Sequence, residues 1–212
     1  MSDLRDRLRQ VRWIGGGSGG GKSTIARRLA TEHDLHLYAT DDVMAGHAAR
    51  STAADSPFLH RFMAMDMDER WLDRSPEVML DTFHWFRGEG FDLIVDDLLA
   101  LPADRGVVVE GFRLLPHLVQ PLLSVPEHAV WLLPSPEFRL AAFDRRGSMW
   151  RIAGHTRDPQ RALDNLLTRD RMFTDRMRAE TLRLGLPVIT PEATMTEGDL
   201  AARVGRAFGL AS

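Results

Sequence analysis

A glycine-rich stretch near the N-terminus carries the residues best suited to chemistry. Residues 16–23 read Gly-Gly-Ser-Gly-Gly-Gly-Lys-Ser and match the pattern G-x-x-x-x-G-K-[ST] at every fixed position. The backbone N–H groups of such a loop form a concave anion site, and the following helix directs its positive end into that site. Lys22 is expected to reach the β- and γ-phosphates of a nucleotide, and the Ser23 hydroxyl to bind Mg²⁺. The predicted nucleotide-binding residues are Gly17, Ser18, Gly19, Gly20, Gly21, Lys22, Ser23 and Thr24.

The residues around this loop fit the motif. Residues 11–14 predict a short strand that enters the loop, and apolar residues at helical spacing predict a helix over 23–33. A Gly/Ser-rich linker that matches by chance is the alternative, but an amphipathic helix would not follow a linker at once. Lys22 is also the only lysine of the chain, whose other basic residues are all arginine. Because Arg does not replace the ammonium group of a phosphate-binding lysine, this single lysine supports the motif.

The composition bounds the remaining function classes. A chain of 212 residues fits a single domain over 1–212, and its net charge of −3 argues against a nucleic-acid partner. The absence of cysteine excludes disulfides, zinc–thiolate sites and cysteine nucleophiles. No apolar run is long enough to span a bilayer, and residues 1–10 lack the apolar core of a signal peptide. We therefore expect a cytoplasmic protein without a membrane partner, as a monomer or homodimer.

Carboxylates follow two predicted strands at their C-terminal ends. Residues 35–38 alternate as a strand and lead to Asp41 and Asp42, and the β-branched run 107–109 leads to Glu110. Ligands of open α/β sheets collect outside the carboxyl ends of the strands. Asp41 and Asp42 are therefore candidates for catalysis, and Glu110 for holding Mg²⁺ together with Ser23. The alternatives are that Thr40 or Asp41 only caps a helix starting near Val43, and that Glu110 is a surface acid.

Residues 43–90 predict a helical segment rather than another strand–helix unit. Helical signals cover 44–54, 58–71 and 76–86, and aromatic residues expected to form a helical core alternate with arginines. One or two of these arginines are expected to hold a substrate, and the candidates are Arg50, Arg61 and Arg70. Residues 91–101 resemble a strand ending at Asp96-Asp97, but their apolar residues recur at i, i+3, i+4, i+7 and i+10. We predict a helix there, ended by Pro102.

The second half of the chain predicts a fourth strand over 128–133 and then an arginine-rich segment. Residues 139–157 carry several arginines and one acid, with Gly147 and Gly154 as hinges. We expect a lid over 144–158 that neutralises phosphoryl charge through Arg145, Arg146 and Arg151, the alternative being an ordinary basic loop. A long helix runs to about residue 184, followed by a strand over 186–190 and a C-terminal helix over 197–208. Within the long helix Asn165 and Arg169 share one face and are further substrate candidates, although a structural hydrogen bond is equally plausible for Asn165.

These features together resemble the P-loop kinase group, which includes nucleoside-monophosphate, shikimate-type and polynucleotide 5′-hydroxyl kinases. The resemblance rests on loop 16–23, the Asp41-Asp42 strand end, the run 107–111, the arginine-rich segment and the overall length. It implies a three-layer α/β/α fold with a five-stranded parallel sheet, the loop strand at its centre, a helical acceptor-binding insertion over 43–90 after strand 2, and a lid after strand 4. No acceptor signature of adenylate, shikimate or guanylate kinases matches residues 43–90.

The resemblance implies an ATP- and Mg²⁺-dependent transfer of the γ-phosphoryl group to a small-molecule acceptor, most simply a hydroxyl. In this interpretation Asp41 or Asp42 accepts the proton of the acceptor. Three alternatives remain open: a nucleoside-monophosphate kinase that needs the insertion's arginines, a nucleic-acid 5′-end kinase, and an ATPase or nucleotide switch without an acceptor. The paired aspartates beside the loop favour the hydroxyl kinase.

Overall fold

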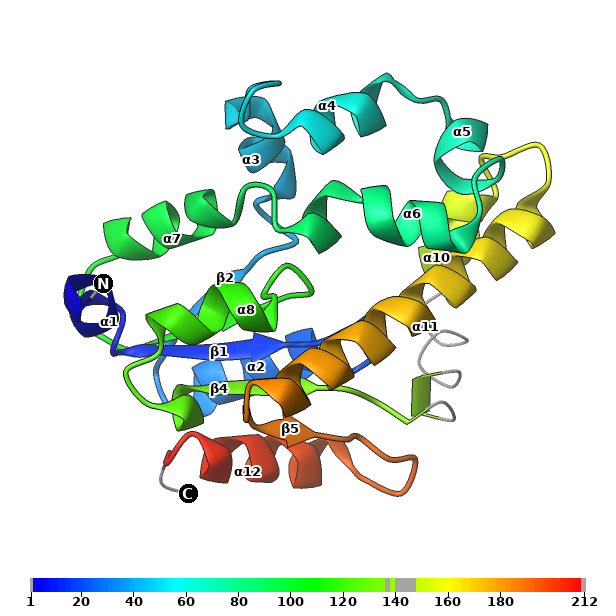
Figure 1. Cartoon of the computed structure of the whole chain (residues 1–212). Coiled ribbons are helices and arrows are strands. Elements are labelled where there is room, and N and C mark those ends of the chain that lie inside the picture. The colour runs from blue at the N-terminus through cyan, green and yellow to red at the C-terminus, as the bar shows by residue number, and fades with distance from the viewer. Residues whose placement is uncertain (1, 136–137, 140–147, 211–212) are drawn as a thin grey trace.

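The computed structural model describes residues 2–135, 138–139 and 148–210 and shows an α/β fold (Figure 1). Five strands form one sheet in the order β2-β3-β1-β4-β5, and every pair is parallel. The strand that leads into the glycine loop, β1, is therefore central, as predicted. The strands are β1 (Val11–Gly15), β2 (His36–Ala39), β3 (Val107–Glu110), β4 (Ala129–Leu132) and β5 (Val188–Ile189).

Helices cover both faces of the sheet because its central strands are apolar on both sides. Val107 and Val109 belong to one buried cluster and Val108 to another, as the alternation of side chains along a strand requires. On the first face the core is completed by α7 (Phe91–Ala100), α8 (Pro116–Val119) and α11 (Pro159–Arg183). On the second face α2 (Lys22–Glu32) and α12 (Glu197–Ala207) pack against each other and the sheet. This gives three layers, α/β/α (Figure 1).

Between β2 and α7 the chain forms the predicted helical segment, but in shorter pieces than expected. The predicted helix over 58–71 is two helices, because Asp66 starts the second with a capping box that includes Glu69. The predicted helix over 76–86 ends at Thr82 and continues as a 3₁₀ turn. The pieces are α3 (Met44–Arg50), α4 (Pro57–Ala64), α5 (Met67–Trp71), α6 (Pro76–Thr82) and η1 (His84–Arg87).

The prediction of a helix over 91–101 is confirmed by α7, whose buried residues are Phe91, Ile94 and Leu98. The prediction of a fourth strand from residue 128 is one residue too early, since His128 closes a short 3₁₀ turn before β4. The fifth strand is shorter than 186–190, and α1 was not predicted. The remaining elements are α1 (Ser2–Arg7), η2 (Gln120–Leu122), η3 (Pro126–His128) and α10 (Ser148–Ala153). Within the described residues, no helix is both long and apolar enough to cross a membrane.

Candidate functional site

The glycine loop connects β1 to α2 and packs against the end of β4 and the middle of α11. Gly21 has φ +82°, a left-handed conformation that costs glycine nothing and lets the chain turn directly into α2. Gly17 is required for a different reason, because a Cβ atom there would lie 2.3 Å from Thr174 Oγ1 on α11. The loop is thus held close to its neighbours by packing that any side chain would disrupt.

Lys22 is the first residue of α2 and is 9% exposed. Its Nζ atom donates a hydrogen bond to the Gly17 carbonyl oxygen over 2.8 Å, so the side chain folds back across the loop. The ammonium charge also acts on the carboxyl groups of Asp41 and Glu110, whose pKa values it lowers against the effect of burial. The single lysine of the chain therefore lies between the glycine loop and the two predicted acids.

Glu110 ends β3 and is 3% exposed, so the alternative of a surface acid is wrong. The register of the sheet pairs Glu110 with Ile14 of β1, just before the loop begins. Burial raises the pKa of Glu110, while Lys22 and a hydrogen bond from the Ser23 hydroxyl oppose that rise. Ser23 and Glu110 thus bring a hydroxyl and a carboxylate together at the start of α2, and oxygen atoms of this kind are the ligands that Mg²⁺ prefers in proteins.

Asp41 and Asp42 lie in the turn between β2 and α3. The Thr40 amide donates to the Glu110 carbonyl oxygen over 2.9 Å, which places this turn beside the end of β3. The alternative of helix capping is wrong, because α3 begins after Val43 and no side chain caps it. Desolvation raises the pKa of the Asp41 carboxyl; Lys22 opposes the rise, Asp42 adds to it and Arg113 opposes it.

Arg113 is a buried cation near Asp41 that the sequence analysis missed. It is 2% exposed, its guanidinium carbon lies 3.9 Å from the ring centre of Trp85, and Nη2 donates to the Gly90 carbonyl over 3.0 Å. Burial lowers its pKa to about 10, so it stays positively charged at neutral pH. The sequence signal was that Arg113 is the one charged residue in the apolar run 112–115. This pattern does not reveal which carboxylate lies near the guanidinium.

A hydrogen-bond network holds both ends of the Asp41–Asp42 turn. Tyr38 Oη donates to Asp97 Oδ2 over 2.7 Å, His47 Nε2 lies 2.7 Å from the same oxygen, and Arg50 Nη1 donates to Oδ1 over 2.8 Å. Burial alone would raise the pKa of Asp97, but the bonds from Arg50, His47 and Tyr38 lower it to about 2. Tyr38 precedes the turn and His47 follows it. Because both are hydrogen-bonded to Asp97 of α7, this carboxylate holds the two ends of the turn in place.

A pocket of about 300 Å³ adjoins the glycine loop at Ser18. Side chains of the helices between β2 and α7, of α10 and of α11 line it, and about half of the lining residues are Phe or Trp. Arg169 and Asp170 of α11 supply its charged groups, with an ion pair of 2.7 Å between them. The lining residues are Ser18, Met44, Phe62, Trp71, Phe83, His84, Trp85, Phe86, Phe112, Ile152, Leu166, Arg169 and Asp170.

Of the six predicted substrate residues, Arg169 lines this pocket, whereas the other five, Asp41, Arg50, Arg61, Arg70 and Asn165, do not. Arg169 lines it and is 7% exposed, with its guanidinium carbon 5.0–5.2 Å from the ring centres of Phe83, Phe86 and Trp71. Asn165 instead donates to the backbone carbonyls of Trp71 and Leu72, which joins α11 to α5. Its role in the described structure is therefore a structural hydrogen bond.

The three arginines predicted in the helical segment are engaged elsewhere. Arg50 is part of the Asp97 network, and Arg61 lies over the Phe58 ring at 4.9 Å. Arg70 donates to the carbonyls of Phe62 and Met63. None of the three is among the described residues that line the pocket beside Ser18.

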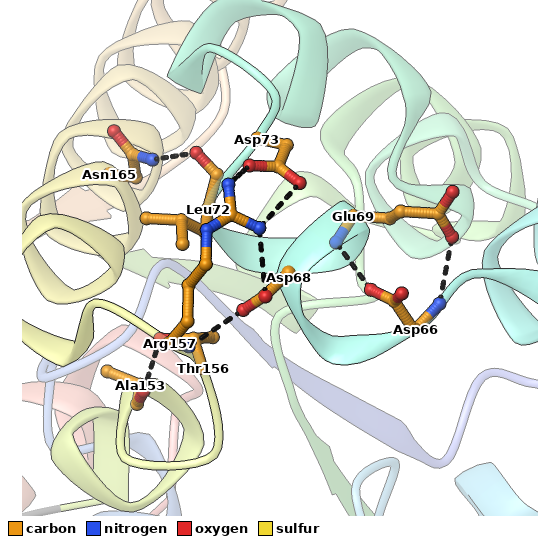
Figure 2. A network of polar contacts seen from close by, with 9 residues as sticks. All are labelled: Asp66, Asp68, Glu69, Leu72, Asp73, Ala153, Thr156, Arg157 and Asn165. Carbon is orange, nitrogen blue, oxygen red and sulfur yellow. Dashed lines mark hydrogen bonds and ion pairs between the residues drawn. The ribbon is translucent and has the colours of Figure 1, made fainter.

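The predicted lid over 144–158 is described only from Ser148 onward, so Arg145 and Arg146 lie outside the described residues. Arg151 is exposed on α10. Arg157 binds Asp68 of α5 and Asp73, which follows that helix: its backbone N–H and guanidinium donate to Asp68, and the guanidinium also binds Asp73 (Figure 2). This ion pair joins the segment after α10 to α5.

A comparison of the chain with protein-family models and with curated proteins found no match. The class of protein is therefore defined by the fold and by the geometry of the loop and its acids. That class is an α/β protein with a parallel sheet and a glycine loop between its central strand and the following helix.

Proposed function

We propose that this chain is an ATP- and Mg²⁺-dependent phosphotransferase of the P-loop kinase type, acting on the hydroxyl group of a small molecule. The observation that carries the proposal is the convergence of three sets of side chains at one loop. A buried lysine spans the glycine loop, Ser23 bonds to the buried Glu110, and the carboxyl of Asp41 lies within the electrostatic reach of Lys22. Phosphate binding, metal binding and proton removal are the functions such a transfer needs.

The loop and Lys22 fit a bound triphosphate. At Gly17 a side chain would clash with Thr174, and at Gly21 it would be strained, so the loop needs glycine at both positions. The backbone N–H groups of such a loop would bind the phosphate oxygens. The helix α2 begins at Lys22 and contributes the positive end of its dipole. Lys22 would exchange its bond to the Gly17 carbonyl for the phosphates, and Gly17–Thr24 would hold them through the backbone.

Ser23 and Glu110 fit Mg²⁺ as a direct hydroxyl ligand and a carboxylate that acts through water. Bound ATP with Mg²⁺ would supply the transferable phosphoryl group, with ADP as the leaving group. Asp41 orients the acceptor hydroxyl and takes its proton as the hydroxyl oxygen bonds to phosphorus and the bond to ADP breaks. Asp42 sets the local charge, and Arg151, with Arg145 and Arg146 of the same segment, would balance the charge of the transferring group.

The placement of the arginines favours a hydroxyl over a phosphate as the acceptor. An acceptor that already carries phosphate needs uncompensated, bidentate arginines in its pocket. Arg50, Arg61 and Arg70 are bound elsewhere, and Arg169 is paired with Asp170. This argues against a nucleoside-monophosphate kinase.

Three substitutions test the proposal. Lys22→Ala should lower ATP turnover at least about 100-fold, because one donor to the transition state is lost. Asp41→Asn should keep the affinity for an ATP analogue within about tenfold but lower acceptor-dependent ADP release by about 10²–10⁴-fold, as expected for a general base. Asp42→Asn tells which of the two acids is the base. ADP release is followed with a coupled assay, and nucleotide affinity by calorimetry.

The controls remove charges of the same sign from exposed positions. Arg28→Ala removes a cation from the same helix as Lys22, and Asp104→Asn an acid after α7. Both should behave as the unmodified protein. Undiminished ATP turnover in Lys22→Ala would refute the nucleotide site, and unchanged transfer in both aspartate variants would remove the base.

A further inference from the structure

The pocket beside Ser18 adjoins both turns that carry the proposed acids. Met44 lines it three residues after Asp41, and Phe112 lines it two residues after Glu110. Ser18 itself belongs to the glycine loop. A molecule in this pocket therefore lies next to the proposed site of transfer, and the pocket's chemistry decides which molecule that is.

Aromatic rings in the walls of the pocket contact one another edge to face. The rings of Phe83 and Phe86 meet at 4.8 Å and 73°, and those of Phe62 and Phe83 at 5.4 Å and 76°. Rings fixed in this way suit a flat aromatic ligand by stacking or edge contacts. A polyol would instead lose water from several hydroxyl groups without finding partners for them.

Among the described residues, the pocket supplies two unpartnered polar atoms, Arg169 Nη1 and His84 Nδ1, but no unpaired charge. Arg169 is neutralised by Asp170, and burial lowers the pKa of His84 to about 3, so His84 is uncharged near neutral pH. The Arg169 Nη1 atom is buried and has no hydrogen-bond partner among the described residues. A buried donor without a partner costs free energy, which a ligand's carbonyl-type oxygen would recover.

From these observations we infer that the pocket binds an uncharged, planar aromatic or heteroaromatic molecule that carries a hydroxyl group and a hydrogen-bond-accepting oxygen or ring nitrogen. The inference rests on the proposed function only in naming this molecule as the phosphoryl acceptor. The volume of about 300 Å³ lies at the lower end of small-molecule sites and fits one ring system with a short substituent. Arg169 Nη1 would bind the accepting atom, and the hydroxyl group would face Asp41.

The test compares probes that differ in one property each. Uridine, adenosine, pyridoxine and benzyl alcohol form the uncharged aromatic set; ribose lacks the ring, and uridine 5′-monophosphate and adenosine 5′-monophosphate add a phosphate. Binding to the full chain without nucleotide is measured by calorimetry and by the rise in Tm. At least one uncharged aromatic probe should bind at least about tenfold more tightly than ribose and than its own phosphate where one exists. Equal or tighter binding of ribose or of the monophosphates, or no binding of any aromatic probe, would overturn the inference.

Two pocket-filling variants locate the bound probe. Met44→Trp and Ile152→Trp add bulk at two different walls, and each should weaken the binding of the aromatic probe at least about tenfold. Leu182→Trp places the same ring on an 82% exposed position of α11 and should have no effect. Tight binding that survives in both folded pocket variants would refute the pocket as the site.

The outcomes separate this inference from the proposed function. Pocket-dependent binding of an aromatic probe without Lys22-dependent phosphoryl transfer would support the pocket and refute the kinase. Lys22-dependent transfer to ribose or to a monophosphate, with no transfer to any probe of the uncharged aromatic set, would support the kinase and overturn the acceptor class.

Discussion

The chemistry of the proposed site depends on a few charged residues whose neighbours set their protonation. Burial raises the pKa of both Asp41 and Glu110, and Lys22 opposes the rise in each case. Arg113 adds a second cation near Asp41 that is held by the Trp85 ring and the Gly90 carbonyl rather than by a carboxylate. We interpret Arg113 as a residue that keeps the base ionised without touching substrate.

Arg113→Gln should therefore shift the pH dependence of transfer. A base is active when deprotonated, so kcat/KM falls as the pH drops through the pKa of Asp41. Removal of the nearby positive charge raises that pKa further, and the acid limb of the profile should move to higher pH. Arg105→Gln, which removes an exposed arginine paired with Asp34, should leave the profile unchanged. An unshifted acid limb in folded Arg113→Gln would contradict the assignment.

At the scale of the elements, the pocket is bounded by helices that other side chains join together. Trp71 of α5 and Ile152 of α10 are both lining residues. The Arg157 ion pairs with Asp68 and Asp73 connect the segment after α10 to α5, as Figure 2 shows. The Asn165 bonds to Trp71 and Leu72 connect α5 to α11. The relative position of two pocket walls thus depends on polar contacts at the surface.

Arg157→Gln should loosen these two helices without unfolding the chain. Amide hydrogen exchange should accelerate roughly severalfold in residues 67–73 and 151–157, with little change in Tm, because local opening is less costly than global unfolding. Since exposed ion pairs are screened by salt, 1 M NaCl should have the same effect on the unmodified protein and little on the variant. Arg176→Gln breaks an exposed pair with Asp81 on another helix and serves as the control. Unchanged exchange in α5 and α10 would show that the ion pairs do not hold them.

At the scale of the whole molecule, two apolar clusters cover the two faces of the sheet, and a third cluster joins α5 to α10 and α11, with aromatic rings of the helical segment packed beside it. His84 lies within this aromatic region, 2% exposed, with rings of Phe62, Phe83 and Trp85 within 5.0 Å of its own. Its Nδ1 atom has no hydrogen-bond partner among the described residues. The folded chain therefore favours the neutral imidazole.

This burial predicts acid sensitivity in a defined pH window. The unfolded chain binds a proton at His84 below about pH 6.5, whereas burial lowers the pKa in the folded chain to about 3. The free energy of unfolding should fall as the pH drops between these values, by at most about 1.4 kcal/mol per unit from this group. Denaturant unfolding at pH 7, 6, 5 and 4 should show this slope in the unmodified protein.

His84→Phe should flatten the dependence, because it removes the titrating group and leaves an aromatic ring in place. His155→Phe changes an exposed histidine and should keep the full slope. Asp97, with a pKa lowered to about 2, adds to the slope mainly below about pH 5. Burial also lowers the pKa values of His47 and His128, so these two residues keep part of the slope in the His84→Phe variant. An unaltered slope in folded His84→Phe would assign the acid sensitivity to other groups.

Local patterns in the sequence determined the order of the strands and helices and the loop at which the acids meet. The helix over 91–101 followed from apolar spacing against a tempting strand alternative, and β3 from a run of β-branched residues. The central position of β1 came from the family resemblance. Helix boundaries were less accurate where capping competes with periodicity, as at Asp66, which divides a predicted helix in two.

The tertiary structure decided which arginines line the pocket and which contact other parts of the chain. Arg169 lies in the pocket while Arg61 and Arg70 stay outside it, and Arg113 lies buried near Asp41. Asn165 serves the backbone of α5. These roles depend on contacts between segments far apart in the chain, and no local periodicity encodes which distant partner a side chain meets. The residues of the glycine loop are adjacent in sequence, so their spacing alone indicates the motif. Burial and charge pairing arise only when the layers pack together.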